Sequence, residues 1–263
     1  MFNRATSKFI FLLSKKKMDS KKMEFPLKNI KRVALRPSEE EGETFYSLPI
    51  AETLRKKFEL SLILPEDKDV KYFKNMNLDI ITYRSKLGLI GVLRLKKRIK
   101  KQYDLLIDFN KDGIPIFSFV LKRPFVISMY DVPGVNIVGR AKDREIIRSY
   151  QFLMRLIGFP SISWQIKGVK GLRKKEEVVG ITSDIGVEYH GLYVVNNYED
   201  LKKVSKIISR KNDLSTFAFF LKIPQVLLLE EDDPFEPPSS IKVVRYSKRI
   251  TSKIIGDCLM LLE

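Results

Sequence analysis

Residues 30–64 read IKRVALRPSEEEGETFYSLPIAETLRKKFELSLIL. Apolar runs at residues 30–36 and 60–64 predict two strands. Between them, a polar turn at residues 37–43 leads into residues 47–58, where apolar side chains recur at near-helical spacing. A strand, a helix and a second strand joined by short turns form the repeating unit of a parallel sheet, and this stretch therefore predicts an α/β fold.

The same alternation continues through the first half of the chain. Further strands are predicted at residues 78–83, 103–109 and 124–129, and helices at residues 70–76, 87–101, 114–121 and 144–157. Each predicted strand is a nearly continuous apolar run, which is typical of a parallel sheet covered by helices on both faces. The first half is therefore predicted to be a doubly wound, Rossmann-like lobe, with ligands at the carboxyl ends of its strands.

A second alternation of strands and helices follows a stretch with little periodicity. Strands are predicted at residues 178–181, 192–195, 224–229 and 241–245, and helices at residues 198–208, 214–221 and 252–262. We therefore predict two Rossmann-like lobes, the second reduced. The predicted division is a basic N-terminal tail at 1–29, an N-terminal lobe at 30–160, a linker at 161–177 and a C-terminal lobe at 178–263.

The composition excludes several classes of protein. The chain has 263 residues with one Cys and one His, too few for an intramolecular disulfide framework or a thiolate and imidazole metal site. It contains no phosphate-binding loop, dinucleotide fingerprint or serine-hydrolase elbow. We expect no metal and no cofactor, and a reducing, cytoplasmic compartment fits this cysteine usage.

Positive charge is concentrated in the first half. The whole chain carries 49 Lys and Arg against 32 Asp and Glu, a net charge of +17, of which residues 1–130 hold +13. The partner could be a phosphorylated glycolipid, a membrane surface or nucleic acid, and the alternative is an ordinary solvated surface. Nucleic acid is disfavoured, because no recognised binding module is visible and aromatic residues do not interleave with the basic helix at 87–101.

Residues 36–58 carry a family resemblance. They resemble the amino-terminal signature of the bacterial heptosyltransferases, glycosyltransferase family 9, in which a strand ends in Arg and a helix opens with Leu-Pro and continues to Leu-Arg-x-x-Phe. The match runs from Gly42 through Leu48-Pro49 to Phe58. Residues 103–109 resemble that family's fourth strand, and residues 212–226 resemble its nucleotide-sugar loop, helix and strand.

The resemblance implies a GT-B fold and a role in lipopolysaccharide biosynthesis. It implies transfer of a sugar from a nucleotide-sugar donor to an anionic cell-envelope glycan or glycolipid, in the cytoplasm or peripherally at the inner membrane. Glu43 stands at the position of the family's catalytic Asp, and a base there must reach the acceptor hydroxyl within about 2.6–3.2 Å. The candidate substrate-binding residues are Gly42, Thr44, Asp108, Asn212, Asp213, Ser215, Thr216 and Asp233.

The chain also departs from the family pattern. The Gly-Pro and the His of the nucleotide loop are missing, and the second lobe is short. Asp213 has the alternative role of capping the following helix. Lys167, Lys170 and Arg173 in the linker are candidates to replace lost phosphate contacts. These departures leave a second hypothesis open, namely a catalytically degenerate relative that serves as a binding or interaction protein.

Overall fold

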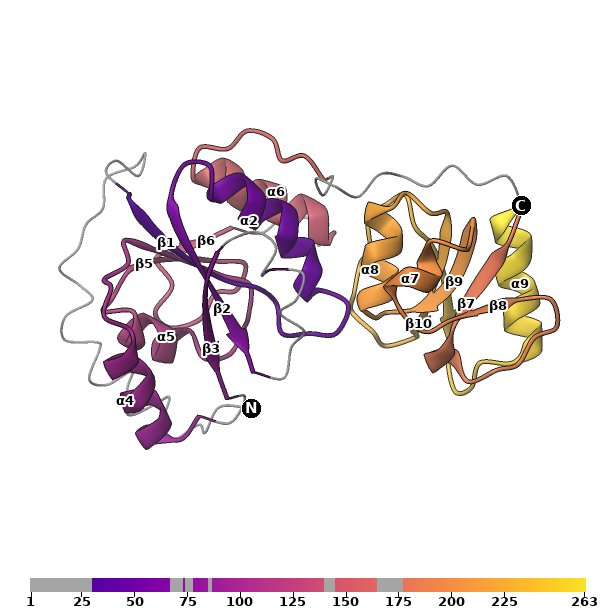
Figure 1. Cartoon of the computed structure of the whole chain (residues 1–263), viewed down its shortest axis with the longest axis horizontal. Helices are drawn as coiled ribbons and strands as arrows, with labels where there is room; N and C mark the ends of the chain where they lie inside the picture. Colours follow the sequence, from indigo (N-terminus) through magenta and orange to yellow (C-terminus); the bar gives the residue numbers. More distant parts are fainter. Residues whose placement is uncertain (1–29, 67–72, 74–77, 85–86, 140–144, 165–176) are drawn as a thin grey trace. The chain divides into compact units, whose positions relative to one another are not determined.

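The computed structural model describes residues 30–66, 73, 78–84, 87–139, 145–164 and 177–263. These residues form two compact units, each built on one parallel sheet (Figure 1). The α/β fold with two Rossmann-like lobes is thus confirmed. The predicted N-terminal tail, the helix at 70–76 apart from Phe73, and the linker cations Lys167, Lys170 and Arg173 lie outside the described residues.

The two units divide the chain at other points than the predicted boundaries. The first unit comprises Met1–Glu39, Ser47–Arg144 and Arg148–Ile162, and the second comprises Glu40–Tyr46, Glu145–Ile147 and Ser163–Glu263. The loop that follows the first strand, predicted as part of the N-terminal lobe, is therefore grouped with the second unit. This grouping brings the residues of the predicted catalytic loop into one compact body with the predicted nucleotide loop.

The first unit contains a six-stranded sheet. Its strands are β1 (Arg32–Arg36), β2 (Glu59–Pro65), β3 (Asp79–Tyr83), β4 (Leu105–Asp108), β5 (Phe125–Ser128) and β6 (Ile137–Val138), the last not predicted. Its order is β3-β2-β1-β4-β5-β6, and all pairs are parallel. The helices are η1 (Thr44–Ser47), which crosses the boundary, α2 (Leu48–Leu54), α4 (Leu89–Arg98), α5 (Ile114–Val120) and α6 (Ile146–Leu156).

Helices cover both faces of the first sheet. Figure 1 shows α4 and α5 on one face and α2 and α6 on the other. On the first of these faces, Ala34 and Leu106 of the central strands are fully buried and belong to one apolar cluster with Val92 of α4 and Phe117 of α5. Burial on both faces explains the continuous apolar runs in the sequence, because neither face of these strands contacts water.

The second unit contains a five-stranded sheet. Its strands are β7 (Val179–Thr182), β8 (Tyr193–Val195), β9 (Lys206–Arg210), β10 (Gln225–Glu230) and β11 (Lys242–Tyr246), in the order β11-β10-β9-β7-β8, all parallel. Its helices are η2 (Ser183–Ile185), α7 (Tyr198–Leu201), α8 (Asp213–Phe220) and α9 (Ser252–Leu262). Helix α9 packs Ile255, Cys258 and Leu262 on one face of the sheet, and α7 and α8 lie on the other (Figure 1).

One predicted helix is wrong in its second half. The helix predicted at 198–208 ends at Leu201, and residues 206–210 form β9, the central strand of the second sheet. Ile207 and Ile208 are fully buried there, one toward each face. The full burial of Ile207, Ile208 and Ser209 in the sheet outweighs the helical spacing of the apolar residues, because tertiary contacts override a local sequence pattern.

Helix α4 presents apolar residues to solvent. The sequence predicts an apolar strip of Leu89, Ile90, Leu93 and Ile99 opposite the basic residues of this helix. Ile99 is buried as predicted, but the other three side chains are 44%, 68% and 51% exposed. The core contacts come instead from Val92 and Leu95. No helix among the described residues is long and apolar enough to cross a membrane.

Candidate functional site

Two clusters of polar residues stand out, one in each unit. In the first unit, Arg36 at the end of β1 and Asp108 at the end of β4 are 1% and 0% exposed. Arg36 Nη1 lies 3.0 Å from Asp108 Oδ2, and the guanidinium also donates to the Glu39 carboxylate. The register pairs these two strand ends directly, so the ion pair follows from the sheet topology.

Asp108 is held from several sides. The backbone N–H of Asn110 donates to Asp108 Oδ1 at 2.9 Å, and the Asn110 amide donates to the Pro37 carbonyl at 2.7 Å. Burial raises the pKa of Asp108, and the charge of Arg36 offsets part of that rise. The fully buried oxygens of Asp108 are occupied by the chain itself and tie the loop after β1 to the loop after β4, and its contact with a substrate stays a prediction.

The second cluster joins the loop Glu40–Tyr46 to the segment between β9 and α8. Lys211 Nζ lies 3.1 Å from Glu43 Oε1, 3.3 Å from Glu40 Oε2 and 3.8 Å from Asp233 Oδ1. Lys211 was not predicted as a site residue. It directly precedes Asn212 and Asp213 of the loop that resembles a nucleotide-sugar loop. A cation next to that loop is the one feature of the sequence that could have indicated its role.

Glu43 is the most perturbed carboxylate of this cluster. Its side chain is 11% exposed. Burial raises the pKa of Glu43 to about 7, against the opposing charge of Lys211. Although burial lowers it, the surrounding carboxylates hold the pKa of Lys211 above its usual value. A carboxylate whose pKa lies near neutrality is suited to general-base chemistry, because it is partly ionised and still basic enough to accept a proton.

The loop covers the start of α8. Gly42 has φ +73°, and a Cβ there would lie 2.9 Å from the Asn212 backbone nitrogen, so only glycine fits. The Thr216 hydroxyl donates to the Gly42 carbonyl at 2.5 Å, and Phe45 packs on Phe217 with ring centroids 4.8 Å apart. Gly42, Glu43 and Thr44 are thereby brought together with Asn212, Ser215 and Thr216, while Asp233 joins them through Lys211.

The first turn of α8 is capped by its own residues. Asn212 is the N-cap: its side chain accepts from the Ser215 N–H at 2.9 Å, and the Asn212 N–H donates to the Ser215 hydroxyl. Asp213, considered as the cap, is instead the first residue of the helix. The Asn212 amide also donates to Asp184 at 2.8 Å. Within the described residues, no group of three or more His, Cys, Asp and Glu side chains is arranged to hold a metal ion.

Comparisons with known proteins identify the fold. No protein-family model and no curated protein matches the chain. Among solved structures, Escherichia coli heptosyltransferase WaaC with ADP-2-deoxy-2-fluoro heptose is similar at 11% identity and a TM-score of 0.58, over 88% of this chain and 100% of that chain. A family 9 glycosyltransferase of Veillonella parvula gives 14% and 0.57, over 91% and 90%.

A third structure, the E. coli ADP-heptose lipopolysaccharide heptosyltransferase II, gives 14% identity and a TM-score of 0.52, over 89% of this chain and 98% of that chain. At these identities the likeness is one of fold. The chain thus has the two-lobed architecture of the GT-B glycosyltransferases. It is structurally similar to family 9 heptosyltransferases.

Proposed function

We propose that this protein is a glycosyltransferase that moves a sugar from a nucleotide donor to a hydroxyl of an anionic cell-envelope glycan or glycolipid. The observation that carries the proposal is Glu43, a buried carboxylate with a pKa of about 7 in the loop after β1, packed beside the start of α8. The similar E. coli structure contains an ADP-heptose analogue, which supports a nucleotide-sugar donor for this fold.

In the proposed reaction, the acceptor oxygen attacks the anomeric carbon while the bond to the nucleoside diphosphate breaks. Glu43 accepts the proton that the acceptor hydroxyl loses. Lys211, which is held within 4 Å of Glu43 and Asp233, stabilises negative charge that develops on the leaving diphosphate. Gly42 and Thr216 fill the position directly at the start of α8, so the donor diphosphate is expected to meet the Lys211 side chain rather than the backbone N–H groups of the helix.

The first experiment is a calorimetric titration of the full chain with a panel of nucleotide sugars and their nucleoside diphosphates. We expect one nucleotide sugar to bind saturably, and Lys211→Met to weaken that binding about tenfold or more, because a charge-assisted contact to phosphate is lost. The matched control is Lys202→Met, a lysine of the same unit that pairs with Glu199 at 2.6 Å, outside this cluster. Absence of binding across the panel contradicts the proposal.

The exposed face of α4 supports an acceptor at a membrane surface. Leu89, Ile90 and Leu93 are exposed on the same helical face as the exposed cations Arg94 and Lys97. Apolar side chains beside cations are the combination that binds anionic bilayers, by insertion together with electrostatic attraction. An anionic glycolipid embedded in such a surface fits this face.

We therefore predict binding to vesicles that contain phosphatidylglycerol. The variant Leu89→Ser/Ile90→Ser/Leu93→Ser is expected to reduce co-sedimentation at least tenfold, with folding unchanged because these side chains are outside the core. Met260→Ser is the matched control, since Met260 is 65% exposed on α9. Equal binding of the triple variant and the wild type, or binding that is insensitive to salt, would exclude this surface as the membrane contact.

The second candidate function is a non-catalytic binding or interaction protein with the same fold. The specific observation in its favour is that the start of α8, where a donor phosphate would bind, is filled by Gly42 and capped by Asn212. Lys211 is likewise engaged with three carboxylates. The titration separates the two functions, because a transferase must bind its donor and a degenerate relative need not.

A further inference from the structure

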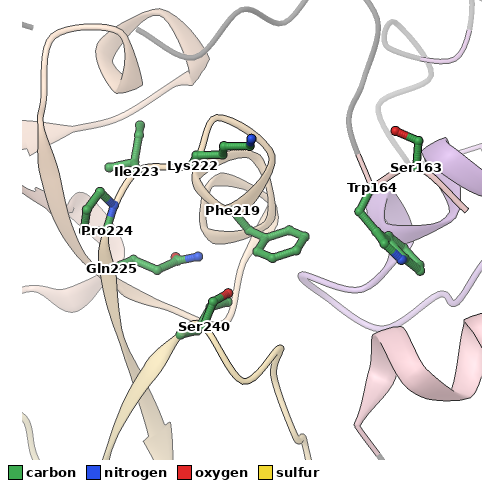
Figure 2. A pocket seen from close by; sticks show the side chains of 9 residues that line it. Ser163, Trp164, Phe219, Lys222, Ile223, Pro224, Gln225 and Ser240 are labelled. Carbon is green, nitrogen blue, oxygen red and sulfur yellow. The ribbon is translucent and has the colours of Figure 1, made fainter. Parts of the chain in front are cut away.

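A pocket lies in the second unit, at the edge of the sheet opposite to Lys211. It has a volume of about 530 Å³ and opens between the end of α8 and the beginning of β10 (Figure 2). Strands of a parallel sheet begin at one edge and end at the other, and Lys211 and Asn212 follow the end of β9. The pocket is therefore separate from the cluster around Glu43, and its volume lies in the range of small-molecule sites.

Gln225, the first residue of β10, is the unusual residue of this pocket. Its side chain is directed toward the Phe219 ring (Figure 2) and it is only 4% exposed. Neither its amide oxygen nor its amide nitrogen has a hydrogen-bond partner among the described residues. An unsatisfied buried polar group destabilises a fold, so an amide in this position points to a use other than stability.

The first unit provides an internal comparison. Residues 119–124 read FVLKRP and residues 219–224 read FFLKIP, and each stretch ends a helix and leads into a strand. Lys122 and Lys222 have the same left-handed conformation, with φ 62° and 57°. The residue that follows the proline is Phe125 in the first unit and Gln225 in the second. The two turns differ in that Arg123 is also left-handed and Ile223 is not, but each leads into a strand that starts at the residue after the proline, and the apolar Phe125 shows that such a strand start does not require an amide.

The other walls of the pocket supply flat apolar surface and a cation. Phe219 is half-buried, and Trp164 lies across the pocket from it (Figure 2). The exposed Lys222 stands at the rim beside Phe219, and the Ser240 hydroxyl lies near Gln225. Lys222 has a left-handed backbone conformation, as Lys122 has in the first unit, so this conformation belongs to the turn, and only the place of the ammonium group at the rim bears on the pocket.

We propose that this pocket binds a purine nucleotide, as a site additional to the one around Glu43. The amide atoms of Gln225 are buried, so its side chain rotates into the pocket on binding, where the donor and acceptor of the carboxamide pair with the adjacent amino group and ring nitrogen on the edge of adenine. The faces of Phe219 and Trp164 stack on the base, as aromatic side chains do in single-stranded nucleic-acid sites. Lys222 pairs with the phosphate.

The test is calorimetric titration of the full chain with adenosine 5′-monophosphate. Saturable binding is expected, about tenfold weaker for purine riboside 5′-monophosphate, which lacks the exocyclic amino group, and absent for ribose 5-phosphate. Gln225→Leu is expected to abolish this binding. The same variant is expected to raise the Tm by about 2–4 °C, since it removes an unsatisfied buried amide, so lost binding cannot be attributed to misfolding.

Lys222→Gly provides the second variant, because glycine suits the left-handed conformation at residue 222. It is expected to weaken adenosine 5′-monophosphate about tenfold while leaving adenosine unchanged. Lys122→Gly makes the same change in the first unit and should alter neither affinity. The proposal is overturned if the wild type does not bind, if ribose 5-phosphate binds equally well, or if binding survives Gln225→Leu. Binding that is lost in Lys211→Met but retained in Gln225→Leu would place the nucleotide at the Glu43 cluster instead.

Discussion

The Glu43→Gln variant is expected to lose sugar transfer by about 10²–10⁴-fold, which is the usual contribution of a general base. Glutamine has nearly the shape of glutamate but cannot accept the proton of the acceptor hydroxyl. Lys211 keeps Glu40 and Asp233 as partners in this variant, so the cluster does not leave an isolated buried cation. The measurement is initial-rate transfer with the nucleotide sugar identified by calorimetry, accompanied by circular dichroism to verify the fold.

The pH dependence of the same reaction gives an independent readout. Below a pH of about 7 Glu43 is protonated and cannot act as a base, so the wild-type rate is expected to rise with pH through about 7 and then to level off. The stability of the fold changes with pH in the opposite direction to the transfer rate. Because the folded state raises the pKa of this acid, it binds the proton more tightly than the unfolded chain, and stability falls as the pH rises from about 4.5 to 7.

Glu40→Gln is the matched control for both readouts. Glu40 lies in the same loop and contacts the same lysine, but its side chain is 62% exposed. Its replacement should leave the transfer rate within a few-fold of the wild type and should preserve the rise with pH, with the midpoint at lower pH because the charge of Glu40 contributes to the raised pKa of Glu43. Unchanged transfer by Glu43→Gln, or an equal loss in both variants, would remove Glu43 from the role of base.

The alternation of strands and helices predicted the two parallel sheets because a strand buried on both faces is a continuous apolar run, which is visible in the local sequence. Helix 252–262 begins and ends where its apolar spacing indicates. The helix predicted at 198–208 extends into β9 because Val204, Ile207 and Ile208 have a spacing that fits one helical turn as well as a strand. The segment forms a strand because it pairs with β7 on one side and with β10 on the other, and these pairings are not visible in the local sequence.

The sequence predicted only part of the candidate site, because some of its contacts join residues that are far apart in the sequence. Resemblance in the loop after β1 and in the loop before α8 identified Gly42 and Asn212, and their backbones approach each other closely in the structure. Lys211 was missed because a single lysine in a chain with 49 Lys and Arg carries little information. Its importance comes from three carboxylates that are far from it in sequence. The ion pair of Asp108 has no local signal in the sequence, because its partner Arg36 is 72 residues away.

The Asp108→Ala variant is expected to destabilise the first unit by about 3 kcal/mol, the lower end of the usual cost of breaking a buried ion pair, because Arg36 keeps Glu39 as a partner. Arg36 is 1% exposed, and its guanidinium lies 4.3 Å above the Phe117 ring, so water cannot replace the lost carboxylate. Asp108 also anchors Asn110, and the loop after β4 would lose that contact too. Urea unfolding followed by fluorescence measures the change in the free energy of unfolding.

The double variant Arg36→Met/Asp108→Leu separates the contribution of the ion pair to stability from that of the hydrogen bonds between Asp108 and Asn110. Replacing both charges with apolar side chains of similar volume is often neutral for stability, because the cost of desolvating two charges disappears together with their attraction. We therefore expect the double variant to recover most of the stability lost in Asp108→Ala. Glu39, which would lose Arg36, is 30% exposed and keeps the Tyr83 hydroxyl as a donor. If the double variant is as unstable as the single one, the hydrogen bonds to Asn110, rather than the ion pair with Arg36, account for the role of Asp108.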